Sequence, residues 1–244
     1  MNDEHACGGQ QSALTIYCLA GIATYPNFME EFGRELARRF PASGSGTAPQ
    51  QQLYPYGERS RGLLRQLHES RHDLLLGTGR VERSLGGGRA AETVWSAGPP
   101  SPGRLVLLAG HSAGGVAAVH AAAILMRRTG RPPDAFRIVM IGAPKCPVPP
   151  DLAPVTLYIR GVDAGGRASD PVTRLGHWGG WDRGRGGLPV WRAGKYAPGA
   201  VVSLPLLGGH PDYFRSGASY RDSEGSTNLE KVLGAVTAWL HRSG

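Results

Sequence analysis

The sequence predicts an α/β fold in which a mainly parallel central sheet is flanked by helices on both faces. Three observations predict this class. With 244 residues, of which 41% are hydrophobic, the chain is long enough to bury one sizeable core. Short apolar runs alternate along it with segments of helical periodicity. The runs are apolar almost throughout, which is typical of parallel strands covered on both faces.

The chain begins with two clear elements. We expect residues 1–12 to be an N-terminal extension and residues 13–244 to form a single domain. Residues 13–19 are an apolar run of strand length, and residues 27–40 have the periodicity of an amphipathic helix. The apolar stripe of that helix consists of Phe28, Phe32, Leu36 and Phe40.

The next stretch is less clearly patterned. Residues 41–51 are rich in Ser, Gly and Pro, which predicts a loop, and residues 52–56 suit a short strand. Leucines give residues 62–76 the pattern of a helix. Residues 77–103 contain many glycines and no consistent period, so the sequence predicts no element there.

The second half alternates regularly between strands and helices. Its predicted strands are residues 105–109, 136–141, 155–160 and 201–207, and its predicted helices are residues 113–128 and 228–241. Gly130 and Pro132 end the first of these helices. Between residues 143 and 155 the chain is too short for a large cap domain, so we expect an open site.

The most informative motif is Gly110-His111-Ser112-Ala113-Gly114, which lies between a predicted strand and a predicted helix. A serine at the apex of so tight a turn has strained backbone angles. Side chains two positions before and two after it would collide with the flanking strand and helix, so both positions need glycine. The turn exposes the Ser112 hydroxyl at the positive end of the helix dipole. The alternative is a glycine-rich strand-to-helix turn with an incidental serine, such as a phosphate-binding turn, but no lysine follows to reach a phosphate.

Other polar candidates follow other predicted strands. In an open parallel sheet, reactive groups gather at the carboxyl ends of the strands. Those ends carry Gly21-Ile22, Ser112, the loop 163–170 with its aspartates, and His210. We therefore expect these residues to lie near one another.

This arrangement resembles the α/β-hydrolase superfamily: a strand, a Gly-x-Ser-x-Gly turn and a helix, then an acid after a later strand and a histidine after the last one. The local Gly-His-Ser-x-Gly-Gly form is similar to the lipase and esterase members. The resemblance extends from about residue 13 to the final helix. It implies that Ser112 is a nucleophile and that His210 is the base that removes its proton.

The position of His210 favours it over the other histidines. Gly208 and Gly209 precede it and give its loop the freedom to bring the imidazole over the serine. The less suitable histidines are His68, His72, His111, His120 and His241.

The acid that orients the histidine has two candidates. Asp170 stands in Ser169-Asp170-Pro171-Val172, which resembles the usual ending of the acid loop in this superfamily. Asp163 follows its predicted strand more closely. We favour Asp170.

The resemblance also implies an oxyanion hole made of two backbone N–H groups. The first donor would be Ala113, directly after the nucleophile, and the second would be Ile22 in the loop after the first strand. Ala20-Gly21 replaces the His-Gly pair that is frequent in the superfamily, which leaves the identity of the second donor open.

Residues 173–198 form an unusual Gly- and Trp-rich insertion between the acid loop and the last strand. It contains Trp178, Trp181 and Trp191. One interpretation is a flap over the site that lines an acyl or aromatic pocket. The other is a surface loop whose tryptophans anchor it to the core.

Composition excludes several other classes. The net charge is +8, but the arginines are scattered and not interleaved with aromatics, so we expect no nucleic-acid binding. Three cysteines, Cys7, Cys18 and Cys146, are too few for a disulfide framework or a zinc site. The longest apolar stretch, residues 116–126, is too short to span a membrane, and Asp3 and Glu4 are unlike a signal peptide, so we expect a cytoplasmic protein.

The predicted function is therefore that of a serine hydrolase that cleaves an ester or thioester through an acyl-enzyme, without a metal or an organic cofactor. The substrate would be a small-molecule or carrier-borne acyl compound. A thioesterase or acyltransferase, which passes the acyl group to an acceptor other than water, is the first alternative. A non-catalytic binding protein that retains the fold is the second.

Overall fold

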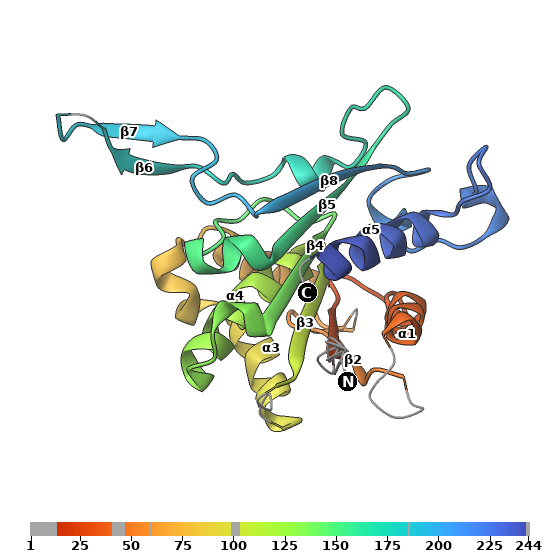
Figure 1. Ribbon diagram of the computed structural model, residues 1–244, viewed down its shortest axis with the longest axis horizontal. Coiled ribbons are helices and arrows are strands. Elements are labelled where there is room, and N and C mark those ends of the chain that lie inside the picture. Colours follow the sequence, from red (N-terminus) through yellow and green to blue (C-terminus); the bar gives the residue numbers. More distant parts are fainter. Residues whose placement is uncertain (1–13, 41–46, 59, 99–102, 185, 243–244) are drawn as a thin grey trace, which may run out of the picture.

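The computed structural model describes residues 14–40, 47–58, 60–98, 103–184 and 186–242. The predicted extension at residues 1–12 and much of the predicted loop at residues 41–51 lie outside these ranges. The described chain has the predicted α/β architecture, in which a parallel sheet lies between helices (Figure 1).

The central sheet has six strands in the order β2-β1-β3-β4-β5-β8, and every neighbouring pair is parallel. The strands are β1 (Leu14–Leu19), β2 (Gln50–Leu53), β3 (Leu105–His111), β4 (Phe136–Ile141), β5 (Thr156–Val162) and β8 (Ala200–Pro205). The short strand that the sequence predicts at residues 52–56 corresponds to β2, which begins two residues earlier, at Gln50. Its pairing ends at Leu53, whose carbonyl accepts from the N–H of Ala20.

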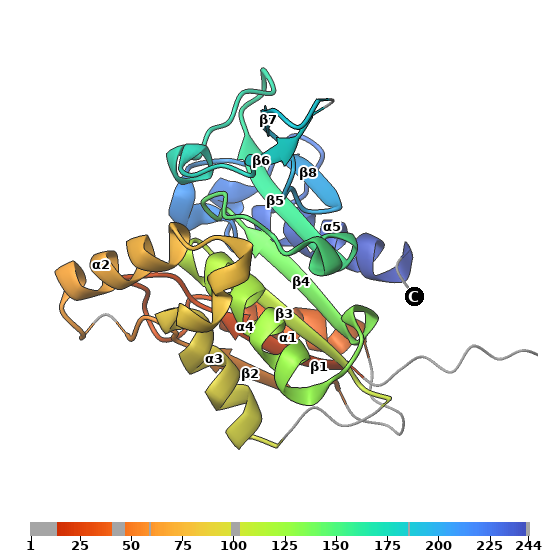
Figure 2. The same ribbon diagram turned by 90° about the vertical axis from the view of Figure 1, so that its left-hand side faces the viewer.

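Helices cover both faces of this sheet (Figures 1 and 2). The helices are α1 (Glu30–Arg39), α2 (Leu63–Leu74), α3 (Leu85–Ser96), α4 (Ala113–Thr129) and α5 (Asn228–Arg242). Helices α1 and α5 pack on one face, and α3 and α4 pack on the other, so the sheet separates two apolar clusters. The short 3-10 helices are Thr78–Arg83, Pro133–Ala135, Pro150–Val155, Pro171–Arg174, His210–Asp212 and Ala218–Tyr220.

The strand order places the site. From β1 the chain passes through α1 on one face to β2, and it then returns through α3 on the other face to β3. The connections therefore diverge between the carboxyl ends of β1 and β3, which is where open α/β sheets bind their ligands. Gly21-Ile22 follows β1 there, and Ser112 follows β3.

Helix α3 lies in the stretch for which the sequence predicts no element. Its first turn is rich in glycine, which weakens helix propensity, but tertiary contacts require these glycines. A Cβ on Gly86 would lie 2.5 Å from the ring of Tyr56, and one on Gly87 would lie 2.4 Å from the Cβ of His120. The hydroxyl of Ser84 caps the helix by accepting from the N–H of Gly87.

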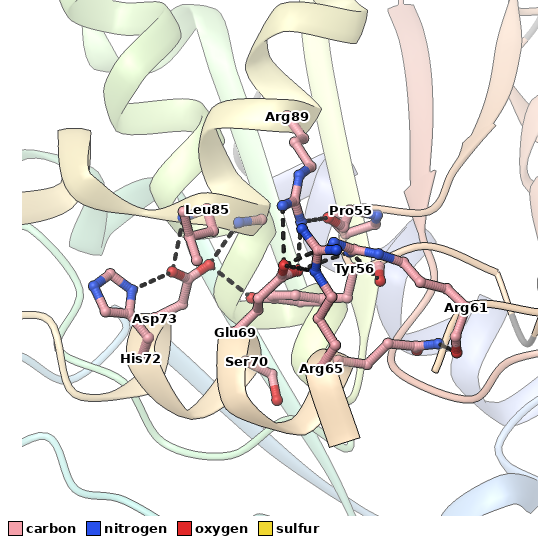
Figure 3. A network of polar contacts seen from close by, with 12 residues as sticks. Pro55, Tyr56, Arg61, Arg65, Glu69, Ser70, His72, Asp73, Leu85 and Arg89 are labelled. Atoms are coloured by element: carbon pink, nitrogen blue, oxygen red, sulfur yellow. Dashed lines mark hydrogen bonds and ion pairs between the residues drawn. The ribbon is translucent and has the colours of Figure 1, made fainter. Parts of the chain in front are cut away.

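Helix α2 forms where the leucines predict it, but its buried face is polar. Gln66, Glu69 and Asp73 are buried, whereas Leu64 is 84% exposed. Figure 3 shows the network that this polar face forms with its neighbours. Glu69 accepts hydrogen bonds from Arg61, Arg65 and Arg89. These hydrogen bonds, the one from Arg89 most of all, lower the pKa of Glu69 to about 2. Their effect is larger than that of burial, which acts to raise the pKa.

Asp73 joins α2 to the start of α3. Its carboxylate accepts from the hydroxyls of Tyr56 and Ser84 and from the backbone N–H groups of Leu85 and Gly86. The carboxylate therefore satisfies two of the N–H groups that a helix leaves free in its first turn.

We expect Asp73→Ala to lower the free energy of unfolding by about 3 kcal/mol, because it leaves buried donors without an acceptor. Urea unfolding measures the change. Glu92→Gln is the control, because Glu92 is an exposed partner of Arg128 and its loss should cost under about 1 kcal/mol. Equal losses in the two variants would contradict this role for Asp73.

The Trp-rich insertion contains an antiparallel hairpin of β6 (Gly180–Arg183) and β7 (Pro189–Arg192). It forms a separate two-stranded sheet that projects beyond the central one (Figure 1). Among the described residues, no helix is both long and apolar enough to cross a membrane.

Candidate active site

The turn at Ser112 has the strained geometry that its sequence predicts. Ser112 has φ 57° and ψ −132°, and its N–H donates to the carbonyl of Ile141 at 3.0 Å. A Cβ on Gly110 would lie 2.1 Å from the carbonyl oxygen of Gly114, and one on Gly114 would lie 2.1 Å from that of Leu19. Both glycines are therefore required for steric reasons, the second because β1 ends against the start of α4.

The structure brings the side chains of Ser112, His210 and Asp170 together. Nε2 of His210 lies 2.9 Å from Oγ of Ser112, and Nδ1 lies 2.8 Å from Oδ2 of Asp170. Because an ionised carboxylate only accepts, Nδ1–H donates to Asp170 and leaves Nε2 free to accept from the serine hydroxyl. This is the tautomer that a general base for Ser112 requires.

Asp170 is held as a carboxylate. It is 1% exposed, its Oδ1 accepts from the N–H of Val172, and its Oδ2 accepts from the hydroxyl of Tyr213 as well as from His210. Burial acts to raise its pKa, but these hydrogen bonds and the charge of His210 outweigh burial, so the pKa is below its ordinary value.

Asp163, the other candidate acid, does not contact the histidine. Its carboxylate accepts from the N–H groups of Gly165 and Arg167 and pairs with the Arg167 side chain at 3.3 Å. It therefore closes its own exposed turn, an ordinary role for an aspartate in such a loop.

Tyr213 is a site residue that the sequence reasoning missed. It is fully buried, accepts from the N–H of Gly161 at 2.8 Å and donates to Asp170 at 3.0 Å. A tyrosine three residues after the histidine gives no sequence signal of this contact, because the contact depends on where the loops meet.

Replacing Tyr213 with Phe should lower kcat about tenfold and also reduce stability, because Asp170 loses a donor and the Gly161 N–H loses its acceptor. Tyr56→Phe is the matched control. It removes another buried hydroxyl bonded to a carboxylate, and it should reduce stability without changing kcat. Steady-state kinetics and urea unfolding on both variants would separate the two effects, and an unchanged kcat in Tyr213→Phe would contradict this role.

His111 lies beside the proposed base, not in its place. Its Nε2–H donates to the backbone carbonyl of His210 at 3.1 Å, and the two rings stack with centroids 4.7 Å apart. Burial lowers the pKa of His111 to about 3, so it is neutral at ordinary pH. Phe28 and Phe214 also contact its ring. His111 thus stabilises the loop that contains His210, through this hydrogen bond and the ring stacking.

The two predicted oxyanion donors, the N–H groups of Ala113 and Ile22, belong to two segments that lie next to Ser112. The N–H of Ala113 starts α4 directly behind Ser112. Gly21, the neighbour of Ile22, lies against the serine, since a Cβ on it would be 3.2 Å from Oγ. Within the described part of the chain, neither the Ala113 nor the Ile22 amide donates to a protein acceptor.

Gln66 holds the loop that contains Ile22. Its buried side chain accepts from the N–H of Ala23 at 2.9 Å and donates to the carbonyls of Glu58 and Arg61. Ala23 has φ 53°, and among the described non-glycine residues only Ala23 and Ser112 have positive φ. Backbone strain therefore collects on the two segments that meet at the site.

We expect Gln66→Leu to lower kcat about tenfold with little change in KM, because the loop donor would act mainly on the transition state. Gln52→Leu is the control, because the Gln52 side chain donates to the carbonyl of Met29 and not to the loop that contains Ile22. Initial rates over a range of substrate concentrations measure both parameters. A change in KM alone would show that Gln66 does not position such a donor.

The sequence left two interpretations of residues 173–198: a flap over the site, or a surface loop that its tryptophans anchor to the core. The three tryptophans do not all behave alike. Trp178 packs against the core, with its ring 5.0 Å from that of Tyr158. Trp181 and Trp191 are 64% and 45% exposed and meet edge to face across the hairpin, 5.4 Å apart. One tryptophan therefore anchors the segment, and the other two do not.

Comparisons with known proteins concern the fold alone. No family model and no curated protein matches the chain. Among solved structures, it is similar to the RedJ thioesterase from the prodiginine biosynthetic pathway in Streptomyces coelicolor, with a TM-score of 0.47 and 14% identity over 93% of this chain and 91% of that one. A second structure, RedJ with a PEG molecule bound in its active site, gives a TM-score of 0.46 and 12% identity over 94% and 90%.

Proposed function

We propose that this protein is a serine hydrolase of the α/β-hydrolase type that cleaves a carboxylic ester or thioester through an acyl-enzyme. One observation carries the proposal: Ser112, His210 and Asp170 form a continuous hydrogen-bonded chain, with contacts of 2.9 and 2.8 Å. These hydrogen bonds lie at the carboxyl ends of the strands, where the connections after β1 and β3 diverge. Ser112 itself is on a strained strand-to-helix turn.

The residues have complementary roles in acylation. Oγ of Ser112 attacks the carbonyl carbon while its proton passes to Nε2 of His210, and Asp170 stabilises the resulting imidazolium. The backbone N–H groups of Ala113 and Ile22 would bind the oxyanion as negative charge develops on it. The imidazolium then gives its proton to the oxygen or sulfur of the leaving group as its bond to the carbonyl carbon breaks, so that an alcohol or thiol departs and the carbonyl re-forms as the acyl-enzyme.

Deacylation repeats these steps with water as the nucleophile. His210 takes a proton from water, the hydroxide attacks the acyl-enzyme, and Ser112 leaves with the proton returned by His210. The short connection between β4 and β5 supports an open site, which suits a carrier-borne acyl group as well as a small ester.

The experiment that tests the proposal is labelling with a fluorophosphonate, which reacts with activated serines. We expect intact mass spectrometry to find one adduct on the wild-type protein and none on Ser112→Ala or His210→Ala. His68→Ala is the control, because His68 lies on α2 outside the site and its loss should leave labelling unchanged.

Two outcomes would contradict the proposal. An adduct on Ser112→Ala would place the reactive nucleophile elsewhere. The absence of an adduct on folded wild-type protein would favour a binding protein that retains the fold without the chemistry.

A further inference from the structure

A cavity of about 680 Å³ lies between the end of α2, the following 3-10 helix, the segment after β4, and the β6–β7 hairpin. Its volume is within the range of small-molecule sites. The proposed catalytic side chains do not line it, so it is separate from the reacting centre.

The cavity nevertheless begins close to that centre. Lys145 lines it and follows Gly142 by three residues, a distance of at most about 11 Å along an extended chain. Gly142 faces the acid, since a Cβ on it would lie 3.0 Å from Oδ2 of Asp170. Leu74, which also lines the cavity, packs against the same core cluster as Ile22.

The hairpin supplies an aromatic wall. Trp181, Trp191 and Tyr196 line the cavity. Glycines let these rings lie directly on the backbone, since a Cβ on Gly179 would be 2.1 Å from Trp191 and one on Gly180 would be 2.4 Å from Tyr196. The flat faces and edges of these rings suit an aromatic or alkyl group.

The charged side chains of the lining are all positive. They are Arg80 and Lys145, and the described lining contains no Asp or Glu. Both are without an ion pair or a side-chain hydrogen bond to any other described residue, although Nζ of Lys145 lies 5.4 Å from the ring of Trp178. Two unpaired cations beside an apolar wall favour a ligand that is itself both apolar and negatively charged.

We propose that this cavity binds the part of the substrate remote from the reacting carbonyl, and that this part combines an aromatic or alkyl body with an anionic group such as a carboxylate, sulfonate or phosphate. The placement beside the reacting carbonyl rests on the proposed function. The anion-binding property of the cavity does not.

The binding test uses Ser112→Ala, which removes turnover from the measurement. Its probes are 8-anilinonaphthalene-1-sulfonate, an aromatic anion, and the uncharged N-phenyl-1-naphthylamine, both followed by fluorescence. Adding Arg80→Gln and Lys145→Gln together should raise the Kd of the anionic probe about tenfold and leave the neutral probe within twofold. Arg71→Gln with Arg183→Gln is the charge-matched control, because these exposed arginines do not line the cavity. Equal weakening of the anionic probe in both double variants would overturn the proposal.

The kinetic test uses the active chain with three chromogenic esters. They are 4-nitrophenyl butyrate, the 4-nitrophenyl half-ester of glutaric acid, with its anion on the acyl side, and 3-carboxy-4-nitrophenyl butyrate, with its anion on the leaving group. The Arg80→Gln, Lys145→Gln variant should raise KM about tenfold for one of the anionic esters and leave the neutral ester unchanged. The affected ester identifies the side of the substrate that the cavity binds.

The two tests separate the two proposals. Selective weakening of anionic-probe binding, together with no fluorophosphonate adduct on the folded wild-type protein, would retain the anion site and reject the hydrolase. Ester turnover in which the variant changes all three KM values alike would retain the hydrolase and reject the anion site.

Discussion

Replacing Ser112 with Ala should lower turnover of any ester that the wild-type protein cleaves by about 10⁴-fold, because the proposed acyl-enzyme forms on Oγ of Ser112. The fold should survive. Among the described residues, the hydroxyl makes one hydrogen bond, with His210, and alanine tolerates the positive φ of this turn no worse than serine does. We therefore expect the free energy of unfolding to change by less than about 1 kcal/mol.

The measurement pairs initial rates with urea unfolding. Ser169→Ala is the control, because Ser169 lies one residue before the proposed acid and takes no part in the hydrogen bonds that join Ser112, His210 and Asp170. Retained turnover in Ser112→Ala would reject the proposed mechanism. Lost turnover together with a large loss of stability would mean that Ser112 acts through the fold.

Asp170→Asn should have the second-largest effect, a loss in kcat of about 10³-fold or more. An amide at this position can donate to Nδ1 of His210, which favours the tautomer with its proton on Nε2 and prevents it from accepting from Ser112. The control is Asp163→Asn, for which we expect less than a twofold change, because its amide oxygen can still accept from Gly165 and Arg167. A larger effect at Asp163 would transfer the role of the acid to that residue.

Asp170→Asn should also change how stability depends on pH. The folded-state pKa of Asp170 lies below its ordinary value of about 3.9. Its contribution to the free energy of unfolding is therefore fully present above pH 3.9 and is lost as the pH falls through the lower folded-state pKa. Urea unfolding between pH 2 and 7 should show a shallower acid limb in Asp170→Asn than in the wild type.

Helix α2 illustrates what local pattern alone does not predict. Its leucines indicate a helix, and a helix forms, but the leucines at Leu63, Leu64 and Leu67 remain exposed. The buried face is polar because side chains from other segments donate hydrogen bonds to it: Arg61 and Arg89 to Glu69, and Tyr56 to Asp73. No spacing within α2 encodes those partners, so its orientation could not be predicted from sequence.

Helix α3 and the choice of acid have the same explanation. The glycines of α3 lower its intrinsic propensity, and the helix is stable because Tyr56 and α4 pack closely against those glycines. Asp163 and Asp170 are both plausible from their positions after β5. Only Asp170 is reached by the His210 loop and by Tyr213, and this depends on contacts between segments some 40 residues apart.

The sequence by itself determined the alternation of strands and helices, the parallel sheet and the turn at Ser112, because these depend on apolar periodicity and on local backbone sterics at Gly110 and Gly114. The tertiary structure decided which acid faces His210, how Gln66, His111 and Tyr213 support the site, and which tryptophans border the cavity. These features depend on where distant segments meet, and the free energy of such contacts has no signature in the spacing of residues along one segment.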